Sequence, residues 1–191
     1  MKTMKKRLSE RLLKFHLLFS IAVGFLLSSC MEYTSHYPIG KPKETTIKSN
    51  LLGDWTYVSG YDRLAKKELG YGGHFMRVSP FNEKEYLVQL IADTIASAKD
   101  IDQFRGYTTN ISKQDFANIS PIDNKGERPV YSIYKYELDG DSLLVLGISE
   151  DIFDSLNISI NSTGQHKKFI KLSLEKPIWW NREYKYVKKD R

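Results

Sequence analysis

The feature that most constrains this chain is a pair of apolar-rich runs separated by a tight-turn signal. Residues 130–138 read VYSIYKYEL, Asp139-Gly140 follows, and a second run occupies residues 141–148. Aromatic and β-branched residues that alternate with polar ones are typical of strands with one buried face. Asp-Gly between two such runs indicates a two-residue type I′ turn, whose central residues both need positive φ. The sequence therefore predicts an antiparallel β-hairpin here.

Similar segments, bounded by turn residues, occur through most of the chain. Their composition predicts strands at 55–58, 74–78, 85–92, 106–111, 116–120 and 183–187, in addition to the hairpin. Six to eight antiparallel strands that end near the C-terminus favour a mainly β fold. We expect a small antiparallel barrel or a sandwich, since closure of a sheet protects its edges.

One or two short helices are expected near the C-terminus. Glu150, Asp151 and Asp154 follow Ser149, and this order is typical of a helix N-terminus with acids in its first turn. Residues 163–173 read TGQHKKFIKLS and are compatible with either a helix or another strand. The sequence leaves that alternative open.

The start of the first expected strand resembles the opening of lipocalin-type barrels. There, a glycine and a tryptophan two positions later close the barrel floor, and Gly53 and Trp55 stand in this arrangement within NLLGDW. Further segments are similar to uncharacterised bacterial proteins that share a Leu-Leu-Gly-x-Trp motif: Tyr37-Pro38-Ile39-Gly40, Arg105-Gly106-Tyr107-Thr108-Thr109, Asp115-Phe116-Ala117-Asn118-Ile119 and Asp139-Gly140-Asp141-Ser142. The resemblance implies a lipocalin-like barrel over about residues 37–188, and it implies no reaction.

The first thirty residues resemble a bacterial lipoprotein signal peptide. Residues 1–29 contain six lysines and arginines but one glutamate, and their basic start is followed by an apolar run at 15–27. That run is shorter than the roughly 20 residues that a helix needs to cross a bilayer. Leu27-Ser28-Ser29-Cys30 resembles a lipobox, in which the cysteine receives a diacylglycerol thioether and signal peptidase II cuts before it. We therefore predict lipidation of Cys30, the only cysteine; a plain secretion signal or an uncleaved anchor is the alternative.

The location of the charge argues against a nucleic-acid partner. The chain has a net charge of +6, of which +5 falls in residues 1–29 and only +1 in residues 30–191. We expect the membrane as the partner, through the lipid anchor on Cys30. The absence of aspartate directly after Cys30 favours the outer over the inner membrane of a bacterial envelope. No protein partner is indicated.

Three segments are expected: a signal peptide at 1–29, a flexible tether at 30–50 and a lipocalin-like β domain at 51–189. Residues 31–50 mix Pro, Gly, Ser, Thr and Lys without an apolar period, which is typical of linkers. In the β domain, Trp55 and side chains that point into the barrel are candidates for ligand binding, although a filled core is the simpler interpretation of them. These side chains are Phe75, Val78, Tyr86, Val88 and Leu90.

Patterns of catalytic and metal-binding residues are weak. Gly140-Asp141-Ser142-Leu143 spells the GDSL string of a hydrolase family, but it lies in the expected hairpin, and Thr163 stands where that family has an aspartate before its histidine. The histidines His36, His74 and His166 show no spacing of metal ligands. We expect His36 and His166 to be solvated, and His74 is the one to watch. The sequence predicts no enzymatic activity, no cofactor and no metal site.

Trp179 and Trp180 lie in a lysine-rich stretch close to the C-terminus. We interpret one tryptophan as part of the barrel core and the lysines as its outer surface. A surface for carbohydrate or anionic lipid is the alternative.

Together, these patterns predict a lipid-anchored envelope protein. We expect a binding module for a small apolar or amphipathic ligand inside the barrel. The alternative is a structural or interaction lipoprotein that docks to an envelope complex and has no ligand cavity. A cavity inside the barrel would favour the first function, and a large apolar patch outside would favour the second.

Overall fold

The computed structural model describes residues 32–69, 74–92, 101–122 and 127–189. Residues Glu32–Arg191 form one compact unit. The expected signal peptide and Cys30 lie outside the described residues. Within the described part of the chain, no helix is long and apolar enough to cross a membrane.

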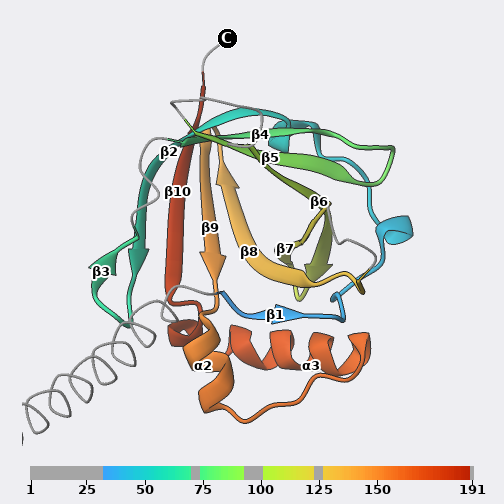
Figure 1. Cartoon of the computed structure of the whole chain (residues 1–191), viewed down its shortest axis with the longest axis vertical. Helices are drawn as coiled ribbons and strands as arrows, with labels where there is room; N and C mark the ends of the chain where they lie inside the picture. The colour runs from blue at the N-terminus through green and yellow to red at the C-terminus, as the bar shows by residue number, and fades with distance from the viewer. Residues whose placement is uncertain (1–31, 70–73, 93–100, 123–126, 190–191) are drawn as a thin grey trace, which may run out of the picture. The chain divides into compact units, whose positions relative to one another are not determined.

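Antiparallel strands close into an eight-stranded barrel, which confirms the expected mainly β fold (Figure 1). Each barrel strand pairs with the next one in the chain, and the last closes the ring by pairing with the first. Every strand of the ring is thus paired on both sides, which removes open edges from the barrel. The strands are β2 (Gly53–Asp62), β4 (His74–Pro80), β5 (Tyr86–Ala92), β6 (Ile101–Ile111), β7 (Gln114–Pro121), β8 (Tyr131–Asp139), β9 (Ser142–Gly147) and β10 (Arg182–Lys188).

Short elements complete the unit. Strand β1 (Thr34–Ser35) pairs with β8, and β3 (Lys67–Glu68) pairs with β2. Single 3₁₀ turns occur at Pro42–Glu44, Ser49–Leu51 and Pro177–Trp179.

Two helices lie between β9 and β10 in the sequence, and Figure 1 shows them beyond β1. Helix α2 (Glu150–Ser155) follows Ser149, as expected. Helix α3 (Thr163–Leu174) resolves the alternative at 163–173 in favour of a helix. The side-chain oxygen of Ser162 caps α3 by accepting a hydrogen bond from the Gln165 N–H at 3.2 Å.

The β8–β9 hairpin turns one residue later than expected. Asp139 pairs with Ser142, so the central residues are Gly140 and Asp141. Gly140 has a φ of +55°, and glycine with positive φ at the first central position is typical of type II′ rather than type I′.

A turn with two consecutive positive φ values connects β6 to β7 instead. Ser112 and Lys113 have φ values of 53° and 66°. Both angles fall in the left-handed region that a type I′ turn requires. No glycine marks this turn in the sequence, so the pattern did not reveal it.

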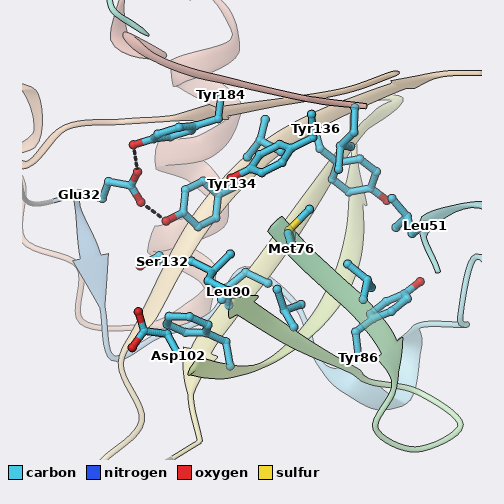
Figure 2. Close-up of a pocket in the computed structure, with 18 of the residues that line it drawn as sticks. Glu32, Leu51, Met76, Tyr86, Leu90, Asp102, Ser132, Tyr134, Tyr136 and Tyr184 are labelled. Atoms are coloured by element: carbon cyan, nitrogen blue, oxygen red, sulfur yellow. Dashed lines mark hydrogen bonds between the residues drawn. The ribbon is translucent and has the colours of Figure 1, made fainter. Parts of the chain in front are cut away.

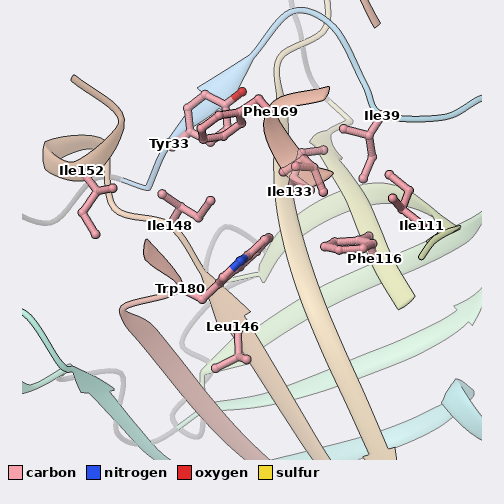
Figure 3. Close-up of a cluster of buried hydrophobic side chains, with 11 residues drawn as sticks. Tyr33, Ile39, Ile111, Phe116, Ile133, Leu146, Ile148, Ile152, Phe169 and Trp180 are labelled. Atoms are coloured by element: carbon pink, nitrogen blue, oxygen red, sulfur yellow. The ribbon is translucent and has the colours of Figure 1, made fainter. Parts of the chain in front are cut away.

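Two hydrophobic clusters use opposite faces of the same strands. Phe116 and Ile133 belong to an outer cluster, whereas their neighbours Ala117 and Tyr134 pack against the cluster centred on Trp55 and Tyr86. This division follows from the two-residue period of a strand. The outer cluster (Figure 3) joins the barrel wall to the helices and consists of Tyr33, Ile39, Ile111, Phe116, Ile133, Leu146, Ile148, Ile152, Phe169, Ile170 and Trp180.

Residues 32–50, which we expected to belong to a flexible tether, instead pack against the barrel. Tyr33 and Ile39 are buried in the outer cluster. The Ile39 N–H donates a hydrogen bond to Asn118 Oδ1 at 2.8 Å. The segment resembles a linker in composition because its apolar residues are few and aperiodic, and tertiary contacts order it nevertheless.

The expected solvation of His166 is wrong. Its side chain is fully buried and hydrogen-bonds to Tyr33 and Tyr37. Of the lysines around it in the sequence, Lys168 and Lys171 are exposed and Lys167 is partly buried, so the composition of the stretch concealed this inward position.

Candidate functional site

The barrel contains a cavity of about 460 Å³ (Figure 2). Cavities that bind small molecules commonly measure about 300–1,000 Å³. Its wall is formed by residues of seven barrel strands together with Glu32, Thr34, Leu51 and Val130. The lining residues are Glu32, Thr34, Leu51, His74, Met76, Val78, Tyr86, Val88, Leu90, Asp102, Phe104, Tyr107, Thr108, Ala117, Ile119, Pro121, Val130, Ser132, Tyr134, Tyr136, Leu143, Val145, Tyr184 and Tyr186.

Most of this wall is apolar. Strand β4 contributes Met76 and Val78, β5 contributes Val88, and β9 contributes Leu143 and Val145. Such a surface gains roughly 25 cal/mol for each Å² of apolar area that a ligand removes from water. The wall therefore suits a hydrocarbon portion of a ligand.

Trp55 is completely buried where β2 begins. Its indole N–H donates a hydrogen bond to the carbonyl oxygen of Leu51 at 3.0 Å. The ammonium group of Lys188 lies 5.2 Å from the centroid of the indole ring and donates to the carbonyl oxygen of Asn50. Trp55 is not among the described lining residues, so its observed role is to pack this end of the barrel.

Glu32 contributes a carboxyl group to the cavity wall. Its Oε1 accepts a hydrogen bond from the Tyr184 hydroxyl at 2.5 Å, and its Oε2 accepts one from the Tyr134 hydroxyl (Figure 2). Burial raises the pKa of Glu32, while the Tyr184 hydrogen bond and the positive charge of Arg182 act in the opposite direction. A backbone bridge to Ser149 fixes the residue at this place.

A buried ion pair lies close to Glu32. Arg182 Nε and Asp62 Oδ2 are 3.5 Å apart, and both side chains are almost completely buried. Burial acts to raise the pKa of Asp62, but hydrogen bonds from Ala65, Asn181 and Leu64, together with the charge of Arg182, leave it lowered. Asp62 is therefore ionised at neutral pH, and its charge balances that of Arg182.

Further polar groups gather on the Glu32 side of the cavity. Figure 2 shows Asp102 and Ser132 on that side, whereas Leu51 and Tyr86 lie opposite. His74 also lines the cavity, and its ring lies 4.8 Å from the ring of Tyr57. Among the described lining residues, two are acidic and none is lysine or arginine. The described residues contain no group of three or more His, Cys, Asp or Glu able to hold a metal ion.

The predicted ligand-binding residues fall in different places. Tyr86 and Val88 line the cavity, as do Val78 and Leu90. Phe75 is not among the lining residues, because successive side chains of a strand alternate between its two faces and the neighbouring Met76 points into the cavity.

The inward placement of Phe75 was therefore wrong. The guanidinium of Arg77 and the ammonium of Lys189 lie 5.7 and 5.6 Å from its ring centroid. Its strand, HFMRVSP, has apolar residues in both phases, so the pattern alone did not fix which phase faces inward.

Glu32 is the residue that sequence reasoning missed. A lone acid in a segment of linker composition carries no signal of burial. The pairing of β1 with β8 and the bridge from Glu32 to Ser149 join residues far apart in the sequence, and they bring this segment against the barrel.

The remaining candidates take part in packing and turns. Ser142, the serine of the GDSL string, is exposed at the start of β9. Trp180 is buried against Phe116, with 5.7 Å between ring centroids, and Trp179 stacks on Phe169 at 6.0 Å. The two tryptophans therefore belong to the outer cluster or pack against it.

The fold and the cavity define a hollow, eight-stranded antiparallel β-barrel. Comparison of the chain with protein-family models, with characterised proteins and with solved structures finds no match.

Proposed function

We propose that this protein binds a small amphipathic ligand inside its barrel. The observation that carries the proposal is the cavity, whose wall is apolar over most of its area and acidic on one side. The hydrocarbon part of a ligand would contact Met76, Val88 and Leu143, and its polar part would lie beside Glu32.

We also propose that Cys30 carries a lipid anchor, which holds the protein in a bacterial envelope at the outer membrane. The proposal rests on the basic and apolar leader and on the lipobox-like LSSC at 27–30. Because Glu32 follows Cys30 by two residues, the intervening chain spans at most about 7 Å. An anchor there would keep Glu32, and with it the cavity, close to a membrane that contains amphipathic molecules.

The proposed role is binding rather than catalysis. The hydroxyls of Tyr134 and Tyr184 both donate to Glu32, and this arrangement suits recognition of a polar group. A structural lipoprotein that docks through its outer face is the alternative function. It predicts that the cavity stays empty of any specific ligand.

Native mass spectrometry tests the proposal. Residues 31–191 are the appropriate sample, because both hydrophobic clusters and all strand pairs of the barrel lie within them. After gentle purification from the periplasm, we expect a bound mass on the order of a few hundred daltons, as is usual for cavities of this size. Denaturation should release it.

Matched variants assign any bound mass to the cavity. Val88→Trp fills the cavity and should abolish the bound mass, whereas Gln89→Trp places the same side chain on the other face of β5 and should retain it. Circular dichroism verifies that both variants are folded. A mass that persists in Val88→Trp, or a protein that never carries one, would contradict binding inside the barrel and favour the structural role.

A further inference from the structure

We propose that the polar end of the ligand is a hydrogen-bond donor, either an ammonium or a hydroxyl group, which the carboxyl of Glu32 binds. The cavity should correspondingly reject amphiphiles that end in a carboxylate, such as fatty acids. This inference rests on the proposed binding function and specifies the ligand class for the same site.

The carboxyl group of Glu32 is held in a fixed orientation by two hydrogen bonds. Tyr134 and Tyr184 each donate to a different oxygen of this carboxyl group, and the group still borders the cavity. An ionised carboxylate offers about four lone-pair positions and donates nothing. The two tyrosines therefore fix the carboxyl while leaving it the capacity to accept hydrogen bonds from a ligand.

The charged side chains of the described cavity wall are acidic. Glu32 and Asp102 are the acidic residues among the described lining residues, which include no lysine or arginine. Arg182 lies near Glu32, but its charge is balanced by Asp62 at 3.5 Å. A carboxylate ligand would therefore meet the like charge of Asp102 and the acceptor oxygens of Glu32, with no lysine or arginine among the described lining residues to pair with it. An ammonium group would meet opposite charges.

The carboxyl group of Glu32 is shielded from water by the surrounding protein. Burial raises the pKa of this carboxyl because a lone negative charge is poorly solvated there. A cationic ligand would supply the missing counter-charge. A hydroxyl ligand would donate a hydrogen bond without adding charge, so it should bind with intermediate affinity.

The experiment measures displacement of the neutral fluorescent probe N-phenylnaphthylamine from residues 31–191 at neutral pH. The competitors are dodecylamine, dodecanol and dodecanoate, which share one alkyl chain and differ in the head group. A hydrogen bond to a charged group commonly changes affinity by about tenfold or more. We therefore expect dodecylamine to bind at least about tenfold more tightly than dodecanoate, with dodecanol between them.

Three variants assign the preference to the cavity. Glu32→Gln keeps the size of the side chain but removes the charge, so it should weaken dodecylamine binding by about tenfold and narrow its advantage over dodecanoate. Asp102→Asn should weaken dodecylamine binding less, because Asp102 lies at an exposed position on the lining. Glu68→Gln is the matched control, since Glu68 lies on β3 and does not line the cavity.

The outcomes separate the two proposals. If the probe does not bind the unmodified protein, the proposed binding function fails. If the probe binds but dodecanoate displaces it as well as dodecylamine does, only the head-group inference fails. An amine preference that persists in both folded variants, Glu32→Gln and Asp102→Asn, would also overturn the inference.

Discussion

The hydroxyl of Tyr33 and Nε2 of His166 lie 2.7 Å apart, and both side chains are buried. The other ring nitrogen, Nδ1, hydrogen-bonds to the carbonyl oxygen of Tyr37, which can only accept. Nδ1 therefore carries the ring proton, and Nε2 accepts the proton of the Tyr33 hydroxyl. This neutral imidazole joins α3 to the segment that follows Glu32, so the helix contributes to placing the carboxyl group of the cavity.

Acid should destabilise the protein through His166. Burial lowers the pKa of His166 from 6.5 to about 4. Between these two pH values the unfolded chain binds more protons than the folded protein, so the free energy of unfolding falls as the pH falls. The loss from this group should total roughly 3 kcal/mol by about pH 4. Urea denaturation at a series of pH values from 7 to 4 measures it.

A variant isolates this contribution from those of the other titrating groups. His166→Gln removes the titrating ring, so the pH dependence between 6.5 and 4 should flatten in the variant. An unchanged pH profile in a folded His166→Gln protein would contradict the assignment.

Glu32 should affect the pH profile in the opposite direction. Burial raises its pKa above 4.5 in the folded state, so the folded protein binds the additional proton. Its contribution to the free energy of unfolding is therefore present at low pH and is lost as the pH rises from 4.5 through the folded pKa. Compared with the unmodified protein, Glu32→Gln should lose stability more steeply on acidification. Urea denaturation of the two proteins side by side tests this difference.

The turn at Ser112 and Lys113 can be improved. Both residues have positive φ, which disfavours side chains other than Gly, Asn and Asp. Replacing the pair with Asn-Gly should raise the free energy of unfolding by about 1 kcal/mol, as measured by urea denaturation.

Gly140 tests in the reverse direction whether a positive φ is costly for residues other than glycine. A Cβ added at Gly140 would meet nothing within 4 Å, so Gly140→Ala tests only the φ of +55°. It should lower the free energy of unfolding by about 1 kcal/mol. No change in either protein would contradict the positive φ values.

Ile39 tests whether the segment after Glu32 belongs to the folded unit. Its side chain is completely buried in the outer cluster, so Ile39→Ala should lower the free energy of unfolding by about 2–4 kcal/mol. Ile122, which is 41% exposed, supplies the control, and Ile122→Ala should change stability by less than about 1 kcal/mol. Equal, small effects of the two substitutions would indicate the flexible tether that the composition suggested.

The sequence predicted the barrel strands well because turn residues bound most of them and their composition is distinctive. Both phases of β7 are buried: Phe116 lies in the outer cluster and Ala117 packs against the inner one. A segment with apolar residues on both faces is recognisable as a strand, but its sequence does not show which face points into the barrel. For this reason Phe75 was misplaced. The strand count was compatible with a barrel or a sandwich, and the resemblance to lipocalin-type barrels favoured the barrel. The hollow interior depends on the packing of side chains that no local pattern encodes.

The polar half of the candidate site was harder to predict than its apolar half. Val88 and Tyr86 follow from the alternation of one strand. Glu32, which is partly buried, and His166, which is completely buried, reach their places through contacts between residues far apart in the sequence, such as Tyr33 and His166. Local composition around each of them indicates exposure, and only the assembled fold reverses it.

The Asp62–Arg182 pair should control both stability and head-group preference. Asp62→Asn removes the charge that balances Arg182, so the guanidinium would instead balance Glu32 across the end of the cavity. Loss of one partner of a buried pair commonly costs about 3–5 kcal/mol, and the nearby Glu32 should keep the loss at or below the lower value. In the probe-displacement assay, the preference for dodecylamine over dodecanoate should shrink.

Asp54→Asn is the control. It breaks an exposed pair with Arg77 and should cost less than about 1 kcal/mol with no change in preference. If Asp62→Asn folds and binds the probe with an undiminished amine preference, then the charge of Arg182 does not reach the head group, and Glu32 alone determines it.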